Sequence, residues 1–274
     1  MQEPVEKKKA LIVVRTYPTP AKKGVEASCT AAITDKGEWL RLFPVPWRLL
    51  PADQRFQKYQ WVEVSVTKAS DARPESYKLK HDGIKILTAP LSSNGEWKAR
   101  KEVVEPLMSH SLCGLQRRRD TFGFPTLGVF RPKSINRLVI RSDEESWSDS
   151  QLASLRQQDL FVALPKQELE KIPFSFLYEF QCADDSCPGH KATCTDWEMA
   201  ESYRKWKAKY GNGWEEKFRL RYETEMISKR DTHFFVGTVH QHPGSWIIVG
   251  LFYPPHSAKA GLLFEGLCSR STND

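Results

Sequence analysis

The chain has 274 residues, of which 40% are hydrophobic and 11% aromatic, so it can bury one large core or two modest ones. Its longest apolar runs, 10–14 and 246–253, fall far short of the roughly 20 residues that a membrane-spanning helix needs. The lysine-rich N-terminus lacks the apolar stretch of a secretory signal, so we expect a cytoplasmic protein with no membrane partner.

The net charge of +7 is unevenly distributed along the chain. Residues 1–142 hold 26 Lys and Arg against 14 Asp and Glu, a net of +12, whereas residues 143–274 hold 15 against 20, a net of −5. A basic half favours a polyanionic partner, and nucleic acid is the commonest one for a cytoplasmic protein. The alternative is a basic surface that serves solubility alone.

Most elements predicted before residue 140 are short strands, rich in β-branched or aromatic residues and bounded by Gly, Pro or Asp. These strands are expected at 10–15, 28–33, 39–43, 60–68, 83–87, 127–130 and 134–141. Ser93 and Glu96 are spaced as a capping box, and apolar residues follow them at helical spacing, which predicts one inserted helix. This pattern is typical of a small β-barrel of the OB or PUA-like kind.

The second half predicts a mixed α/β module. A helix is expected from Ser148, with Gln151 as its capping partner, and further helices at 196–209 and 214–226. Strands are expected at 174–181 and in a closing hairpin, 233–240 with 246–253. We predict an α+β protein with a basic barrel domain at 1–145 and a zinc-containing domain at 146–274.

Four side chains suited to zinc lie close together in the sequence: Cys182, Cys187, His190 and Cys194. Zinc in proteins is usually held by four Cys or His ligands in a tetrahedron, and Pro188 and Gly189 allow a tight reversal between two of them. Because four protein ligands close the coordination sphere, we predict a structural rather than a catalytic zinc ion. The alternative is chance clustering of reduced cysteines.

Two carboxylates, Asp196 and Glu198, follow the last of these cysteines, where an enzyme could hold a general base firmly. A structural role is the competing interpretation, because Thr195 and Glu198 are spaced as a capping box and acidic residues favour the first turn of a helix.

His240 and His242 are expected at the tip of the closing hairpin, where they could bind a metal, transfer protons or contact phosphate. A pair of solvent-facing turn residues is the alternative interpretation.

A basic run with aromatic neighbours offers the two ingredients of nucleic-acid binding, since arginines neutralise phosphates and aromatic rings stack on bases. The residues expected to bind nucleic acid here are Arg117, Arg118, Arg119, Phe122 and Phe124. Asp120, held among arginines, would stay ionised and could orient a water molecule. Basic residues of the barrel, Arg15, Lys22, Lys23 and Arg41, are expected to contact the duplex as well. The alternative is a solvated charged turn.

The segments 10–20, 37–46 with its Gly-Glu-Trp-Leu-Arg-Leu, and 71–77 resemble a group of bacterial proteins. In that group a barrel of OB or PUA-like type precedes a Cys/His cluster, an Asp-Trp-Glu and a His-Gln-His-Pro. The resemblance covers most of the chain but names no activity. Proteins of this general kind occur among phage-defence genes, where one activity is a DNA glycosylase that removes glucosylated hydroxymethylcytosine.

Three functions remain open from the sequence. The first is a DNA glycosylase that flips a modified base into an aromatic pocket, with Asp196 or Asp120 as base and His240 or His242 polarising the leaving base. The second is a metal-dependent endonuclease, and the third a non-catalytic reader of modified DNA or RNA. Double-stranded DNA is the expected partner, and the sequence does not define the oligomeric state.

Overall fold

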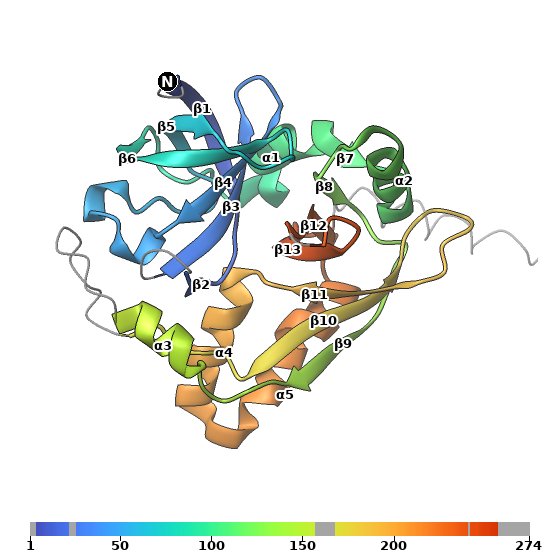
Figure 1. Ribbon diagram of the computed structural model, residues 1–274. Coiled ribbons are helices and arrows are strands. Elements are labelled where there is room, and N and C mark those ends of the chain that lie inside the picture. Colours follow the sequence, from blue (N-terminus) through green and yellow to red (C-terminus); the bar gives the residue numbers. More distant parts are fainter. Residues whose placement is uncertain (1–3, 22–25, 157–167, 241, 257–274) are drawn as a thin grey trace, which may run out of the picture.

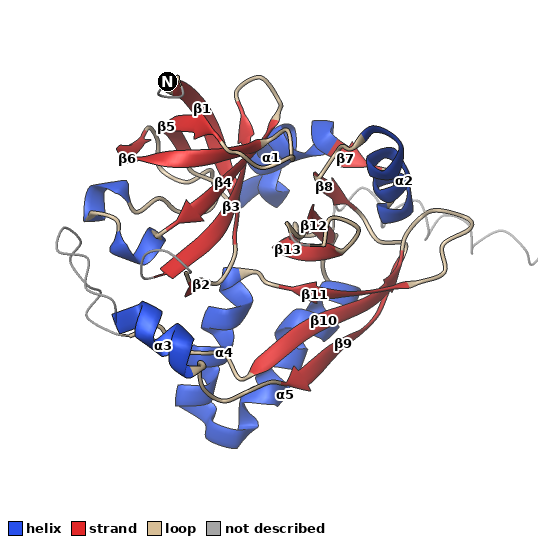
Figure 2. Cartoon of the chain, viewed as in Figure 1, coloured by secondary structure: helices blue, strands red, loops and turns tan. Residues whose placement is uncertain are grey.

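The computed structural model describes residues 4–21, 26–156, 168–240 and 242–256 (Figure 1). Two predicted nucleic-acid contacts, Lys22 and Lys23, lie outside the described residues. The described chain forms a mixed α+β fold in which an N-terminal barrel adjoins a second sheet with helices (Figure 2). Both the fold class and the N-terminal barrel expected from the sequence are confirmed.

The barrel is built from the first strands of the chain. These are β1 (Glu6–Arg15), β2 (Thr19–Pro20), β3 (Glu26–Thr34), β4 (Trp39–Val45), β5 (Trp61–Lys68) and β6 (Ser76–Ile86). They pair in the order β1-β5-β6-β4-β3-β2, and a further pairing of β1 with β3 closes five of them into a ring. The β4–β6 pair is parallel, whereas β1 runs antiparallel to both of its neighbours.

Strand β1 is buried on both faces along its second half. Side chains alternate across a strand, so Ala10 and Ile12 pack inside the barrel while Leu11 and Val13 face the opposite way. The outward-facing pair joins a core that includes Phe235 of the second sheet. The continuous apolar run of β1 is therefore the seam between the barrel and the second sheet.

The second sheet follows in the chain, with its strands in the order β7-β8-β12-β13-β11-β10-β9. Its strands are β7 (Met108–Ser109), β8 (Leu127–Phe130), β9 (Ser134–Ser142), β10 (Phe174–Gln181), β11 (His190–Cys194), β12 (His233–Thr238) and β13 (Trp246–Phe252). The predicted aromatic alternation in β10 buries Phe176, Tyr178 and Phe180 in one core.

The helices lie around the two sheets, with α4 and α5 below β9 to β11 in the view of Figure 1. They are α1 (Asn94–Val104), α2 (Leu112–Phe122), α3 (Asp149–Arg156), α4 (Trp197–Tyr210), α5 (Trp214–Arg219) and α6 (Glu225–Ser228). A π-helical turn (Leu220–Thr224) joins α5 to α6. The predicted four-residue repeat of Trp214, Phe218, Tyr222 and Met226 is buried throughout this region.

Of the three capping boxes predicted at helix N-termini, one is present in the structure and two are not. Ser148 and Gln151 form the predicted capping box, with each side chain bonded to the other's backbone N–H. The box predicted at Ser93 and Glu96 is wrong, because Ser93 makes no capping hydrogen bond and Glu96 has a left-handed φ of 55°. The box predicted at Thr195 is also corrected, since the N-cap of α4 is Asp196.

The two sheets divide between Ile86 and Met108. Strands β8 and β9 precede the predicted domain boundary near residue 145, yet they pair with β12 and β10 of the second sheet. The boundary at 145, as a division between folding units, stays a prediction. Among the described residues, no helix is long and apolar enough to cross a membrane.

Candidate metal site and polar pocket

A group of four potential metal ligands lies at one end of the second sheet, formed by Cys113, Cys182, Cys187 and His190. Their ligand atoms all lie within 4.8 Å of one another. His190 Nε2 is 3.3 Å from Cys113 Sγ and 3.5 Å from Cys182 Sγ, and the two sulfur atoms are 3.5 Å apart. Ligands bound tetrahedrally to zinc at about 2.0–2.3 Å are separated by roughly 3.3–3.8 Å, so the cluster could hold such an ion.

Three elements converge on this cluster. Cys113 lies in the first turn of α2, whose N-cap Ser111 accepts a hydrogen bond from the N–H of Gly114. Cys182 follows the end of β10, Cys187 lies in the next loop, and His190 begins β11. An ion pair between Arg117 of α2 and Asp184 fixes this loop against the helix. A metal ion here would join α2 to the β10–β11 connection.

The electrostatics favour a thiolate at Cys182 and oppose one at Cys113, whose pKa burial and the neighbouring Cys182 raise to about 12. Burial opposes ionisation of Cys182, but backbone hydrogen bonds from Cys113 and Asp184 outweigh it and lower the thiol pKa to about 6. Thiolates rather than thiols bind metal ions, so this side chain is prepared for the charge that a ligand must carry.

Cys194 is not part of the cluster, which corrects the predicted ligand set. It lies at the far end of β11 from His190, and a strand rises about 3.3 Å per residue, so four residues of extended chain separate the two by roughly 13 Å. Cys194 is buried, and burial raises its pKa. The sequence spacing suggested a compact loop, whereas β10 and β11 pair as strands and leave the fourth position to Cys113.

A second feature is a polar pocket of about 600 Å³ between the barrel, α1, α4 and the end of β13. Cationic and aromatic side chains make up much of its lining, and Glu198 is the one carboxylate among the lining residues described. The charged and aromatic residues are Arg15, Lys58, Tyr59, Trp97, Arg100, Glu198, Arg221, Arg230 and Tyr253. A pocket of this size and chemistry can enclose a small anionic or aromatic ligand.

Lys58 and Asp196 form a buried ion pair beneath this pocket. Lys58 Nζ lies 3.2 Å from Asp196 Oδ2, 3.5 Å from Glu198 Oε2 and 3.1 Å from the carbonyl oxygen of Leu251. Burial lowers the pKa of Lys58, but the two carboxylates outweigh it and raise the pKa well above its usual value. Lys58 is therefore a cation that holds both carboxylates in place.

The two neighbouring carboxylates have different surroundings. Asp196 is 3% exposed, and besides Lys58 it accepts hydrogen bonds from the N–H groups of Glu198 at 2.7 Å and Leu251 at 2.9 Å. Burial raises the pKa of Asp196, while these donors favour its charged form. The first turn of α4 and strand β13 therefore occupy the oxygens of Asp196, which caps the helix. This is the structural role that was the alternative to catalysis in the sequence analysis.

Glu198 faces the pocket and keeps 44% of its side chain exposed. Lys58 lowers its pKa, and Tyr253 donates a hydrogen bond to its Oε2 at 3.4 Å. Of the two carboxylates, Glu198 is therefore the one that a ligand or water molecule in the pocket can reach.

Two residues of the pocket wall have unusual backbone conformations, and arginine side chains pack against aromatic rings around the pocket. Tyr59 and Trp97 both have φ of 64°, a region that side chains other than glycine rarely adopt and that tends to occur at functional sites. Their rings are 5.9 Å apart, and the guanidinium of Arg100 lies 4.2 Å from the ring centre of Tyr59. The guanidinium of Arg15 packs against both Trp47 and Trp197, 4.3 and 4.7 Å from their ring centres, and these two rings contact each other at 5.2 Å.

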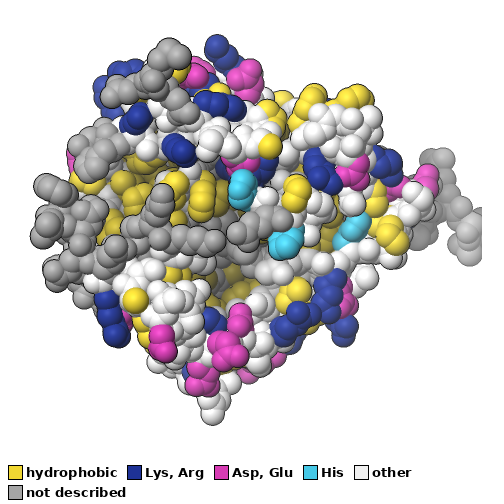
Figure 3. Space-filling model, viewed as in Figure 1, with side chains coloured by type: hydrophobic (Ala, Val, Ile, Leu, Met, Phe, Trp, Pro, Cys, Tyr) yellow, Lys and Arg dark blue, Asp and Glu magenta, His cyan; other side chains and the backbone are white. Residues whose placement is uncertain are grey.

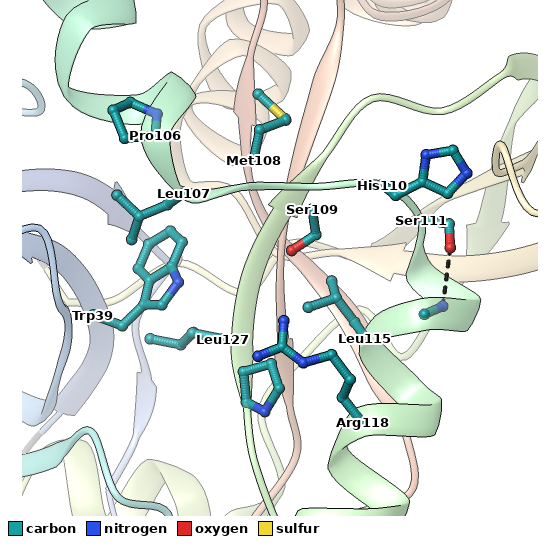
Figure 4. A pocket seen from close by; sticks show the side chains of 12 residues that line it. Trp39, Pro106, Leu107, Met108, Ser109, His110, Ser111, Leu115, Arg118 and Leu127 are labelled. Carbon is teal, nitrogen blue, oxygen red and sulfur yellow. Dashed lines mark hydrogen bonds between the residues drawn. The ribbon is translucent and has the colours of Figure 1, made fainter.

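The predicted basic run lies on α2 and in the turn that follows. Arg117 pairs with Asp184 and Arg119 with Asp120, so the carboxylate of Asp120 is engaged rather than aimed into a pocket. Arg118 is exposed and lines a second cavity of about 460 Å³. Figure 4 shows Arg118 reaching from α2 toward Leu127, across the cavity from Trp39.

Two aromatic rings stand exposed beyond this helix. Phe122 is 64% exposed and Phe124 50%, and their ring centres are 6.2 Å apart. Gly123, with φ of 78°, ends α2 and makes the turn between them. Exposed paired rings beside arginines are a surface on which bases can stack.

The predicted histidines lie at the tip of the β12–β13 hairpin, and both are exposed. His240 Nδ1 is 3.5 Å from Asp71 Oδ1 in the β5–β6 loop, and Arg73 of that loop donates to the carbonyl of Thr238. Within the described residues, neither His240 nor His242 joins a group of three potential metal ligands. In Figure 3, His side chains lie in the middle of the visible face, with Lys and Arg above and to the right.

Arg41, which was predicted to contact nucleic acid, is buried instead of lying on the surface. Its guanidinium is 3% exposed, pairs with Glu75 at 3.1 Å and donates to the carbonyl of Thr126 at 2.8 Å. Because Thr126 leads into β8, this ion pair ties the barrel to the second sheet, and Arg41 has a structural role.

The residues that the sequence reasoning missed lie far from the motifs that it found. Cys113 is 69 residues from Cys182, and Lys58 is 138 residues from Asp196. Lone lysines and cysteines carry no pattern in one sequence. The positive φ values of Tyr59 and Trp97 likewise have no signal, because neither residue is a glycine or asparagine.

The fold and these sites define an α+β protein with a barrel, a Cys/His cluster and a polar pocket. The chain belongs to the family described as Domain of unknown function (DUF8757), whose model matches residues 108–267. A second model, Domain of unknown function (DUF8758), matches residues 6–106. No curated protein matches the sequence. A solved structure described as "Structure of murine DNA binding protein bound with ds DNA" is similar at 7% identity and a TM-score of 0.32, covering 92% of this chain and 97% of that chain.

Proposed function

We propose that the protein binds DNA and accepts one nucleotide in the polar pocket beside Glu198. The observation that carries this proposal is the pocket itself, where cations and aromatic rings surround one ionised carboxylate. Aromatic rings stack on a flipped base and cations offset backbone charge. The exposed rings of Phe122 and Phe124 and the nearby Arg118 add an outer surface for the rest of the strand.

The more specific proposal is an N-glycosylase that removes a modified base. Glu198 takes a proton from water as the water oxygen bonds to C1′ of the sugar. The bond from C1′ to the base nitrogen breaks, its electron pair leaves with the base, and the base gains a proton from solvent. This assigns the base role to Glu198, with Asp196 and Lys58 holding it.

We propose zinc as the ion of the Cys113, Cys182, Cys187 and His190 cluster, with a structural role. Three thiol groups and one imidazole suit zinc, and four protein ligands leave no open position for chemistry. The cytoplasmic location expected from the sequence agrees with reduced cysteines and belongs to the same proposal.

The test is incubation with DNA carrying natural base modifications, including phage DNA, followed by alkali and gel analysis, with and without chelator. We expect alkali-dependent breaks on a modified substrate, and none with Glu198→Gln. Glu215→Gln is the matched control, because Glu215 lies on the surface and pairs with Arg219. Breaks without alkali that chelator prevents would instead indicate the endonuclease.

A non-catalytic reader is the second candidate, and the occupied oxygen of Glu198 favours it. Lys58 and Tyr253 both contact Oε2, and a reader needs that carboxylate only for hydrogen bonding. The reader predicts salt-dependent binding of modified DNA without any product. Absence of both binding and product on plain and modified DNA would rule out the proposed function.

A further inference from the structure

Three residues that line the polar pocket each contain a buried polar atom without a hydrogen-bond partner, namely Arg15 Nη1, Tyr59 Oη and Arg230 Nε. A buried polar group that lacks a partner costs free energy, so such atoms are few in folded proteins. Tyr59 is only 4% exposed, so bulk water does not satisfy its hydroxyl group. Three such atoms around one cavity indicate a ligand that accepts several hydrogen bonds.

The charges of the pocket specify that ligand further. Lys58 is balanced by Asp196 and Arg221 by Glu225, at 3.2 and 2.6 Å. Within the described part of the chain, neither Arg15 nor Arg230 forms an ion pair. Burial also lowers the pKa of Arg15, and the charges of Glu198 and Asp196 offset this effect only in part. An anionic ligand would offset the remaining effect.

The geometry of Arg15 is fixed before any ligand arrives. Its guanidinium packs against the adjoining rings of Trp47 and Trp197, so less side-chain entropy would be lost on binding. The strained backbone of Tyr59 places its ring and hydroxyl in the same pocket wall. Glu198 in the same pocket would repel an anion, but Lys58 neutralises much of that repulsion.

We propose that Arg15, Tyr59 and Arg230 bind a phosphate group of the nucleotide in this pocket. Phosphate presents several acceptor oxygens and negative charge, and guanidinium groups match it better than any other side chain. The identification of the ligand as a nucleotide rests on the proposed function, whereas the phosphate site itself does not. Phosphate bound here would orient the sugar relative to Glu198.

The test is isothermal titration of the full chain with inorganic phosphate, a deoxynucleoside 5′-monophosphate and the matching nucleoside without phosphate. We expect the monophosphate to bind at least tenfold more tightly than the nucleoside, and inorganic phosphate to compete with it. Arg230→Gln and Arg15→Gln should each weaken monophosphate binding about tenfold or more, because each removes a charged hydrogen bond. Arg137→Gln is the control, since Arg137 is an exposed partner of Glu179.

The outcomes separate this proposal from the proposed function. Equal affinity for nucleoside and monophosphate, or unchanged binding by both pocket variants with an unaltered unfolding midpoint, would overturn the phosphate site. If monophosphate binds as expected but no oligonucleotide does, the phosphate site stands and the DNA function fails. Tight oligonucleotide binding without any effect of the two arginine variants would leave the DNA function and remove the phosphate site.

Discussion

At the scale of single residues, one buried cation decides what two neighbouring carboxylates do. Asp196 and Glu198 are two positions apart, yet Asp196 caps α4 and bonds to β13 while Glu198 faces the pocket. Lys58 touches both, so it neutralises the buried charge of Asp196 and keeps Glu198 ionised. Of these two closely spaced acids, one therefore has a structural role and the other is accessible from the pocket.

We expect Lys58→Met to lower the free energy of unfolding by about 3–5 kcal/mol, because it leaves the Asp196 carboxylate buried without its cation. Urea denaturation at neutral pH measures this. The loss should shrink as the pH falls, since burial raises the pKa of Asp196 and protonation then removes the unpaired charge.

The matched double variant, Lys58→Met with Asp196→Asn, leaves no buried charge and should recover much of the stability. A single variant that loses less than about 1 kcal/mol would contradict the buried pair.

The sequence identified Asp196 and Glu198 as neighbouring carboxylates and Arg15 as a separate nucleic-acid contact, but it gave no reason to place Arg15 with the two acids. Their neighbours in the pocket come from separate elements, namely Lys58 and Tyr59 before β5, Trp97 in α1 and Arg230 after α6. Only the closed barrel and its packing against the second sheet bring these side chains together. Local patterns carry no information about such contacts, so the pocket could not be predicted from the sequence.

At the scale of elements, helix α2 serves two sites at once. Its first turn supplies Cys113 to the metal cluster, and its last turns carry Arg118 and Phe122 on the surface. A metal ion bound by Cys113 would therefore fix the orientation of the basic face as well. The sequence predicted no helix for this run and weighed a charged turn as the alternative to nucleic-acid binding, whereas the run is helical from Leu112 to Phe122.

We expect Cys113→Ser to abolish stoichiometric zinc and to lower the melting temperature, because the cluster loses one of its four ligands. Elemental analysis and thermal unfolding of the purified protein measure both effects. Cys194→Ser should retain zinc, since Cys194 lies at the other end of β11. The reverse result, zinc kept by Cys113→Ser and lost by Cys194→Ser, would restore the ligand set suggested by spacing alone.

We expect Arg118→Gln to weaken DNA binding and to reduce the slope of log affinity against log salt by about 0.9, the value for one lost phosphate contact. Its stability should change by less than about 0.5 kcal/mol, because the side chain is exposed. Filter binding at several salt concentrations measures the slope. Arg137→Gln, on the exposed face of β9, is the control, and an equal loss of affinity there would argue against a specific role for α2.

At the scale of the whole molecule, the barrel and the second sheet share one apolar core. Leu11 and Val13 of β1 pack with Val129, Phe235 and other residues of the second sheet. A Cβ on Gly250 of β13 would lie 2.9 Å from a methyl group of Val14, closer than normal packing allows, so β1 and β13 are in tight contact. Arg41 also crosses this junction, because it pairs with Glu75 of the barrel side and donates a hydrogen bond to the carbonyl of Thr126 next to β8.

This shared core predicts that the protein unfolds in one cooperative transition, despite its two sheets and two family models. Each sheet alone would expose the outward face of β1 or the facing side of β12 and β13, and apolar surface left in water removes roughly 25 cal/mol of stability per Å². Calorimetry should therefore give equal calorimetric and van't Hoff enthalpies. A fragment of residues 1–107 should show no cooperative transition. Two resolved transitions, or a folded fragment of residues 1–145, would instead establish independent domains, because the seam formed by β1 would then be dispensable.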